Sequence, residues 1–151
     1  NPVYKGKKRK NFLEKNVDEK YFLSEKIKKT ILSDGNHKWK AKSEINKIPA
    51  RPLVKTMHKM HRASQDNYYS LDFIKKIHGK SNEIEKKDNN KIRRLTPKEA
   101  FRLQGFEDEF VENAIKAGIS NTQLYMQAGN AVTVNVVESV LEHIFETVNQ
   151  N

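Results

Sequence analysis

Two groups of residues in this chain have types and spacing that could do chemistry. A basic segment, residues 48–72, reads IPARPLVKTMHKMHRASQDNYYSLD and contains His58 and His61. Nearer the C-terminus, the string QAGNAV places Gly129 next to Asn130. The chain has no cysteine, which excludes disulfides, thiolate zinc sites and thiol nucleophiles within it. The chemistry to weigh is therefore the binding of nucleic acid, of a metal or of a small ligand.

The basic segment has side chains suited to nucleic acid. Lys and Arg meet phosphates, while Arg can bind guanine and Asn or Gln can bind adenine at base edges. The chain carries a net charge of +10, from 29 Lys and Arg against 19 Asp and Glu, which favours a polyanionic partner. The alternative is that these residues merely solvate an exposed loop. With Lys42 as a further phosphate contact, the expected contacts are Lys55, Thr56, His58, Lys59, His61, Arg62, Gln65 and Asn67.

His58 and His61 also have the His-x-x-His spacing that can place two imidazoles together on a helix and bind a metal. No cysteine and no paired carboxylate accompany them, so we interpret them as polar loop histidines and expect no metal. Tyr68 and Tyr69 could stack on nucleic acid. Neighbouring tyrosines in a short strand more often place one ring in the core and one outside, so one of them is expected to be structural.

The elements before residue 93 have weak patterns. Residues 11–36 are expected to be helical, with Ser24 as an N-cap. Two β-capable pieces, residues 53–57 and 67–71, bracket the basic segment and predict short strands joined by a polar loop. Residues 80–91 are charged and nearly free of apolar side chains, as a surface connection should be.

The elements after residue 93 have stronger patterns. Thr96 and Glu99 form both ends of a capping box, so a helix is predicted from Pro97. This helix should end at Gly105, and a second should run over residues 108–117 until Gly118. Ser120 with Gln123 predicts a third, short helix that leads into a turn at residues 127–130. A final helix should follow Thr133, with an apolar stripe at Val134, Val137, Leu141, Ile144 and Val148.

Two strings in this region resemble motifs of the DNA cytosine-5 methyltransferase family. RRLTPKEAFRLQGF, residues 93–106, resembles the ninth motif, and QAGNAV, residues 127–132, resembles the tenth and last. In that family the variable region before the ninth motif is the target-recognition domain, and residues 48–72 lie where its base-reading loops are expected. The resemblance divides the chain into a target-recognition region (1–92), a ninth-motif helical support (93–119), and a tenth-motif turn with the C-terminal helix (120–151).

The resemblance implies an α+β fold: a small recognition domain with short strands and helices, and a C-terminal helix that packs on a Rossmann-like catalytic domain in the intact enzyme. That domain is expected to lie N-terminal to this chain, because none of the family's upstream motifs is present. Where the family often has proline, this chain has Glu107 and Thr133. We expect these two to serve their helix starts through the dipole or a side-chain cap.

The implied activity is methyl transfer from S-adenosylmethionine to carbon 5 of cytosine in double-stranded DNA, within a bacterial restriction-modification system. Carbon 5 becomes nucleophilic only after a thiolate adds at carbon 6, and the base must first be flipped out of the duplex. Without a cysteine, the chain alone should be inactive. Alternatives are a non-enzymatic DNA-binding module and a natural non-catalytic subunit of a two-chain methyltransferase.

The resemblance also suggests roles for the motif residues. In the family, the tenth-motif turn lines the cofactor pocket, so the expected cofactor contacts are Gly129, Asn130, Ala131 and Val132. The alternative is a plain helix-connecting turn. Arg94, Glu99 and Arg102 are expected to form an ion-pair cluster with a scaffolding role. With them, the structural motif comprises Thr96, Gln104 and Gly105.

Partners and location follow from composition and pattern. No run of about 18 apolar residues is present, so neither membrane insertion nor secretion is suggested and a cytoplasmic protein is expected. The stripe of the final helix would be exposed without the catalytic domain. In isolation this helix is therefore expected to fray or to form a homodimer with another copy.

Overall fold

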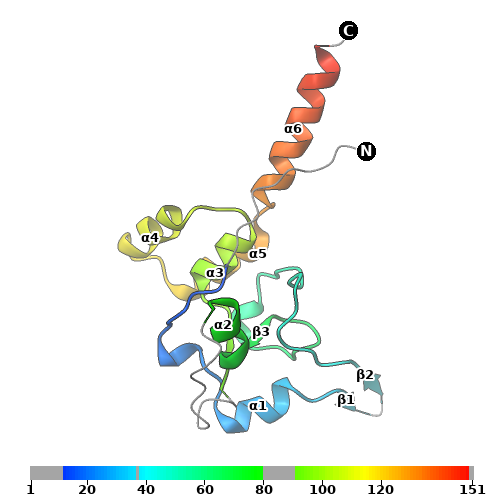
Figure 1. Ribbon diagram of the computed structural model, residues 1–151, viewed down its shortest axis with the longest axis vertical. Helices are drawn as coiled ribbons and strands as arrows, with labels where there is room; N and C mark the ends of the chain where they lie inside the picture. The colour runs from blue at the N-terminus through cyan, green and yellow to red at the C-terminus, as the bar shows by residue number, and fades with distance from the viewer. Residues whose placement is uncertain (1–11, 37, 80–90, 150–151) are drawn as a thin grey trace.

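The computed structural model combines helices with two short antiparallel ladders, which confirms the α+β class (Figure 1). It describes residues 12–36, 38–79 and 91–149. None of the helices in this part of the chain has the length and apolar run needed to cross a bilayer. The elements are η1 (Glu19–Tyr21), α1 (Glu25–Ile31), β1 (Gly35–Asn36), β2 (Trp39–Lys40), η2 (Met57–Lys59), β3 (Tyr68–Ser70), α2 (Leu71–Ile77), β4 (Ile92–Arg94), α3 (Pro97–Leu103), α4 (Asp108–Lys116), α5 (Asn121–Asn130) and α6 (Val134–Val148).

The helices after residue 93 follow the local sequence closely. Both predicted capping boxes are present, at Thr96 for α3 and at Ser120 for α5. Gly105 and Gly118 have φ values of +88° and +84°, the left-handed conformation that glycine adopts most easily at a helix end. These predictions are confirmed.

The end of α5 corrects the expectation of a turn at residues 127–130. The helix continues to Asn130, and the backbone leaves it at Ala131, whose N–H still donates to the Gln127 carbonyl. A single glycine lowers helix propensity by about 1 kcal/mol, which tertiary packing of the last turn can offset. QAGN is therefore helical.

Glu107 and Thr133 stand at the N-caps of α4 and α6, but neither side chain makes a capping hydrogen bond. The side-chain cap, one of the two expected routes, is thus made by neither residue. Glu107 still adds negative charge at the start of α4, where the helix dipole favours it. The Thr133 hydroxyl has a different partner, because it donates to the Gln104 side chain at 2.7 Å.

Of the residues 11–36 that were expected to be helical, only those of α1 and the short η1 before it form helices. Ser24 is the N-cap as predicted, since its hydroxyl accepts from the Ile27 N–H at 3.4 Å. Farther upstream, Glu14 bonds to the C-terminal half of the chain instead: its N–H donates to a Glu99 carboxylate oxygen at 2.6 Å. A distant partner has overridden local helix propensity.

Residues 53–57, predicted as a strand, form no ladder. Residues 53–56 belong to an irregular strap, residues 48–56, which bends at 48–49, turns at 55–56 and runs into η2. Pro49 and Pro52 have no N–H to donate, which disfavours a paired strand. The strap is instead held by the Asn67 side chain, which accepts from the Arg51 N–H at 2.8 Å and donates to the Arg51 carbonyl at 2.9 Å.

The predicted strand over residues 67–71 does form, as β3, which pairs antiparallel with β4. Tyr68 and Tyr69 point to opposite faces of the ladder, and both are fully buried. Tyr68 packs with Leu23 and Ile31, whereas Tyr69 packs with Leu13. The expectation of one exposed ring was wrong because apolar clusters cover both faces. The predicted surface connection at 80–91 lies outside the described residues except for Lys91.

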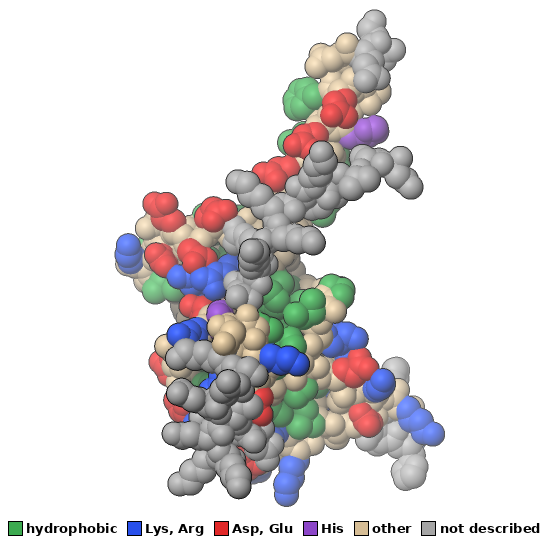
Figure 2. Space-filling model, in the orientation of Figure 1, with side chains coloured by type: hydrophobic (Ala, Val, Ile, Leu, Met, Phe, Trp, Pro, Cys, Tyr) green, Lys and Arg blue, Asp and Glu red, His purple; other side chains and the backbone are tan. Residues whose placement is uncertain are grey.

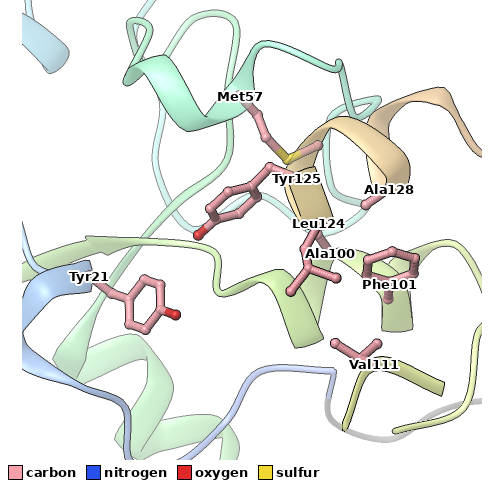
Figure 3. Close-up of a cluster of buried hydrophobic side chains, with 8 residues drawn as sticks. All are labelled: Tyr21, Met57, Ala100, Phe101, Val111, Leu124, Tyr125 and Ala128. Carbon is pink, nitrogen blue, oxygen red and sulfur yellow. The ribbon is translucent and has the colours of Figure 1, made fainter. Parts of the chain in front are cut away.

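A third apolar cluster joins the recognition half to the motif helices (Figure 3). Met57 from η2 and Tyr21 from η1 meet Leu124 and Tyr125 of α5, with Phe101 of α3 alongside. Nearly all of the contacting area is removed from water, since each of these residues is at most 8% exposed. Burial of such side chains is the main favourable term here.

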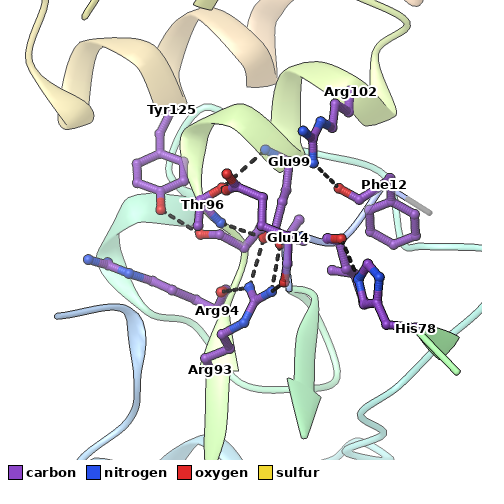
Figure 4. A network of polar contacts seen from close by, with 11 residues as sticks. Phe12, Glu14, His78, Arg93, Arg94, Thr96, Glu99, Arg102 and Tyr125 are labelled. Atoms are coloured by element: carbon purple, nitrogen blue, oxygen red, sulfur yellow. Dashed lines mark hydrogen bonds and ion pairs between the residues drawn. The ribbon is translucent and has the colours of Figure 1, made fainter. Parts of the chain in front are cut away.

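A buried ion pair lies beside this cluster (Figure 4). Arg93 of β4 is 1% exposed and Glu99 of α3 is fully buried. The guanidinium donates to both carboxylate oxygens, at 2.6 and 2.8 Å. The same oxygens accept from the Glu14 and Thr96 N–H groups. Four donors therefore satisfy one buried carboxylate, as a charge inside a fold requires.

Replacing Arg93 with methionine leaves the Glu99 carboxylate buried without its counter-charge. We expect Arg93→Met to lower the free energy of unfolding by about 3–5 kcal/mol, measured by urea denaturation. The matched control is Lys42→Met, which also removes one positive charge but from a side chain that is 83% exposed. The urea midpoint of Lys42→Met should stay close to that of the wild type. Equal losses in the two variants would contradict a special role for the buried pair.

Candidate functional site

The residues predicted to contact nucleic acid differ widely in exposure. Lys55, Lys59 and Gln65 are exposed to solvent. Thr56, His58, His61 and Arg62 are half-buried, while Asn67 is buried. Exposed lysines at both ends of the Lys55–Lys59 turn can meet a polyanion without rearrangement.

Two of the predicted base readers are engaged within the protein. The side-chain amide of Asn67 accepts from the Arg51 N–H through its oxygen and donates to the Arg51 carbonyl through its nitrogen, so it holds the strap. The Arg62 guanidinium donates to the Ser33 hydroxyl at 2.7 Å and to the Ser33 carbonyl at 3.3 Å. It thereby ties the segment to the end of α1. In this conformation neither side chain is free to read a base edge.

The two histidines have separate partners rather than a shared one. His61 Nδ1 lies 3.0 Å from an Asp66 carboxylate oxygen, which also accepts from the His61 N–H at 3.2 Å. Burial raises the pKa of Asp66, and the nearby His61 opposes that rise. His58 Nδ1 lies 3.2 Å from the Lys55 carbonyl oxygen. Within the described ranges, no group of three or more potential metal ligands is found.

The ninth-motif charges do not form one cluster, which corrects that expectation. Glu99 pairs with Arg93, a residue that the motif analysis did not single out. Arg102 makes two hydrogen bonds of 2.6 Å to Asp108 and holds the pKa of that carboxyl at about 2. Arg94 donates to the His58 carbonyl at 3.1 Å and lies over the ring of Tyr125. Through that bond, the ninth motif supports the η2 turn of the basic segment.

Gln104 joins three elements at the end of α3. Its amide nitrogen donates to the Ala128 carbonyl at 2.9 Å, and its side-chain oxygen accepts from Thr133. Its main-chain carbonyl accepts from the Val134 N–H at 2.8 Å. Gly105 lies against the same helix start, because a Cβ there would be 2.9 Å from the Asn135 side chain. The ninth motif thus fixes both the end of α5 and the direction of α6.

Gly129 faces the chain's own backbone. A Cβ at this position would lie 2.6 Å from Lys55 Cα, and closer still to the Lys55 nitrogen and the Val54 carbonyl carbon. The close approach expected of this glycine is therefore made to the strap, and that space is filled. Asn130 and Val132 have exposed side chains, and Ala131 is half-buried. Of the four predicted cofactor contacts, Asn130 and Val132 are the ones whose side chains are open to a ligand.

An open groove of about 540 Å³ runs between the strap and the junction of α5 with α6. Its walls include Arg51 and Leu53 on one side, and Ala131, Val132 and Val136 on the other. The groove is too open to enclose a small ligand by itself.

The α6 helix projects from the rest of the protein, and none of its residues is buried (Figures 1 and 2). Its sequence contains three glutamates and no Lys or Arg, whereas the Lys and Arg side chains visible in Figure 2 lie on the body, interspersed with Asp and Glu. The predicted stripe is exposed: Val137, Leu141, Ile144 and Val148 are between 42% and 65% exposed. Exposed apolar patches of this kind are typical of protein-contact surfaces.

Comparison with known proteins decides the family. The profile described as "C-5 cytosine-specific DNA methylase" matches residues 3–146. The chain belongs to this family. The matched residues include the strap, the basic segment and both motif strings.

Named relatives are bacterial and phage methyltransferases. The type II methyltransferase M1.ScrFI of Lactococcus lactis subsp. cremoris is 31% identical over 143 residues, 93% of this chain and 32% of that protein. M.SsoII of Shigella sonnei, also a type II methyltransferase, is 33% identical over 137 residues, 91% of this chain and 32% of that protein. The orphan methyltransferase M.SPRI of Bacillus phage SPR is 58% identical over 57 residues, 38% of this chain and 13% of that protein. This DNA methylase chain therefore spans a third or less of these relatives. No solved structure matches it.

Removing the Thr133 hydroxyl tests how the motif regions are joined. Thr133→Val keeps the shape of the side chain but leaves the Gln104 side-chain oxygen without that donor. We expect a loss of about 1–3 kcal/mol in the free energy of unfolding, together with faster amide exchange at Val134. Thr122→Val, at an exposed position of α5, is the control and should exchange like the wild type at Val134. Unchanged exchange in Thr133→Val would contradict this anchor.

Proposed function

We propose that this chain is the target-recognition and C-terminal part of a DNA cytosine-5 methyltransferase that uses S-adenosylmethionine. Residues 1–92 form the recognition region, residues 93–119 its helical support, and residues 120–151 the return to the catalytic part. The observation that carries the proposal is the family match over residues 3–146 in a chain without any cysteine. Methyl transfer to cytosine needs a thiolate, which another part of the enzyme must supply.

Exposed lysines support DNA contact through the basic segment. Lys55 lies just before η2 and Lys59 is its last residue, and Arg94 of the ninth motif donates to the His58 carbonyl between them. The η2 turn of the basic segment is therefore held in place by the ninth motif and presents positive charge to solvent. In this proposal Lys55 and Lys59 meet phosphates, whereas Gln65 and His61 read base edges. Arg62 and Asn67 hold the segment in place.

The exposed face of α6 supports contact with the catalytic part. Relatives that match more than nine tenths of this chain are about three times its length. A partner surface of the same enzyme is thus the natural cover for the stripe at Val137, Leu141 and Ile144. Val132 of the adjoining groove and the neighbouring exposed Asn130 would then face that part and line one wall of its cofactor pocket. S-adenosylmethionine supplies the methyl group when it is bound there.

The names of the relatives support a role in a restriction-modification system, since two of them are type II methyltransferases. An orphan enzyme is the second candidate, because the relative with 58% identity is named an orphan methyltransferase. The two differ in genetic context and not in chemistry. A restriction gene beside the gene for this chain would favour the first.

The isolated chain should not methylate DNA. With no cysteine in its sequence it cannot add a thiolate to cytosine. Transfer of labelled methyl from S-adenosylmethionine to duplex DNA is the measurement, and no incorporation above background is expected. Activity should return when a chain that carries the upstream motifs is added or fused. Incorporation by the purified chain alone would refute the proposal.

DNA binding by the chain should depend on the lysines of the basic segment. We expect weak binding with strong salt dependence, and the slope of log K against log salt should fall by roughly one for each phosphate-contacting lysine removed. The test compares Lys55→Ala/Lys59→Ala with Lys15→Ala/Lys116→Ala, two exposed lysines outside the segment. Both variants lose two positive charges. Equal losses of affinity would mean that net charge, rather than this segment, binds DNA.

A further inference from the structure

Gly129 of the tenth motif lies very close to the backbone of the basic segment. Gly129 is in the last turn of α5, and Val54 and Lys55 are in the strap, more than 70 residues earlier in the sequence. A Cβ on Gly129 would lie 2.6 Å from Lys55 Cα, whereas real Cβ contacts essentially never fall below 3.0 Å. The atoms in the way are main-chain atoms, so no side-chain rotation can relieve the overlap. The helix and the strap can keep this spacing because residue 129 is glycine.

Contacts on both sides of Lys55 hold the strap in place, so it cannot move away from Gly129 without losing them. On one side of Lys55, the backbone of Arg51 is held by two hydrogen bonds to the side-chain amide of Asn67. On the other side, Met57 is 8% exposed and packs in the same apolar cluster as Ala128 and Tyr125 of α5. The Met57 N–H also donates to the Val54 carbonyl at 3.0 Å. A residue larger than glycine at 129 must therefore displace Val54 and Lys55 or tilt the end of α5.

This contact lies between the proposed DNA contact and the proposed wall of the cofactor pocket. Lys55 and the η2 turn after it belong to the proposed DNA contact. Asn130, next to Gly129, begins the exposed connection that carries Ala131 and Val132. The contact between Gly129 and the strap thus fixes the distance from the DNA-contacting turn to the proposed wall of the cofactor pocket.

We propose that Gly129 is a positioning residue for DNA recognition, which sets the strap and the Lys55–Lys59 turn at the correct distance from the tenth motif. This inference rests on the proposed function and gives the glycine a role different from cofactor contact. A displacement of about 1 Å far from the reacting atoms can lower catalysis by about a hundredfold. A larger residue at position 129 should therefore raise the KM for DNA and leave the affinity for S-adenosylmethionine unchanged.

The experiment uses the full-length enzyme that contains this chain, with Gly129→Ala as the variant. Steady-state methyl transfer to duplex DNA of mixed sequence should show a KM for DNA raised roughly tenfold or more, and calorimetry should show an affinity for S-adenosylmethionine within about twofold of wild type. In the 151-residue chain, amide exchange at Lys55 should be faster. Alanine is favoured over glycine within helices, so helix propensity alone predicts no harm.

Gly118→Ala is the matched control. Gly118 also has to accept a Cβ, at φ +84°, but no atom lies within 4 Å of that Cβ. The variant strains the backbone and costs stability without touching the strap, so its KM for DNA should stay within about twofold of wild type. If Gly129→Ala and Gly118→Ala behave alike, or if Gly129→Ala loses cofactor affinity with an unchanged KM for DNA, the inference is overturned.

A second variant decides the matter if Gly129→Ala does not fold. Asn67→Asp keeps the acceptor for the Arg51 N–H and removes the donor to the Arg51 carbonyl, which loosens the strap from its other side. A raised KM for DNA with unchanged cofactor affinity supports the inference, and an unchanged KM for DNA overturns it. Failure of the wild-type enzyme to methylate DNA would instead refute the proposed function, so the two failures are distinguishable.

Discussion

The buried pair of Arg93 and Glu99 is the constraint on which the rest of this structure depends. A carboxylate with no exposure is costly unless donors replace its water shell, and Glu99 has four such donors. They come from the N-terminal segment, from β4 and from the start of α3. Because each donor is fixed by the same two oxygens, these three pieces cannot shift independently. Glu14 adds a further tie, since its carboxylate accepts from the Thr96 hydroxyl.

From this pair, a continuous set of contacts leads to both proposed surfaces. Arg94, next to Arg93, donates to the His58 carbonyl and so supports the η2 turn of the proposed DNA contact. At the other end of α3, Gln104 bonds α5 and the residues that begin α6. Gly129 links these two ends, because α5 packs directly on the strap at this residue. The ninth motif is therefore a scaffold that holds the proposed DNA contact and the proposed cofactor wall at one spacing.

Sequence reasoning succeeded where the determining interactions are local. Capping boxes at Thr96 and Ser120, and glycines at helix ends, act over three or four residues and can be read from the string itself. It failed where the partner is distant. Asn67 was interpreted as a base reader, although its amide bonds the backbone of Arg51, 16 positions away. Arg93 was overlooked because Glu14, which completes its environment, lies 79 residues upstream.

The distribution of charge and apolar surface separates two kinds of partner. Isolated helices of 12–15 residues are marginal in water, and α6 has 15 residues with none buried. Its stability must come from covering the stripe that begins at Val134 and ends at Val148. A polyanion cannot do this, because α6 has no Lys or Arg and carries Glu138, Glu142 and Glu146. The lysines near η2 have the opposite character. One surface of the chain is thus suited to protein and the other to DNA, and Gln104 and Gly129 lie between them.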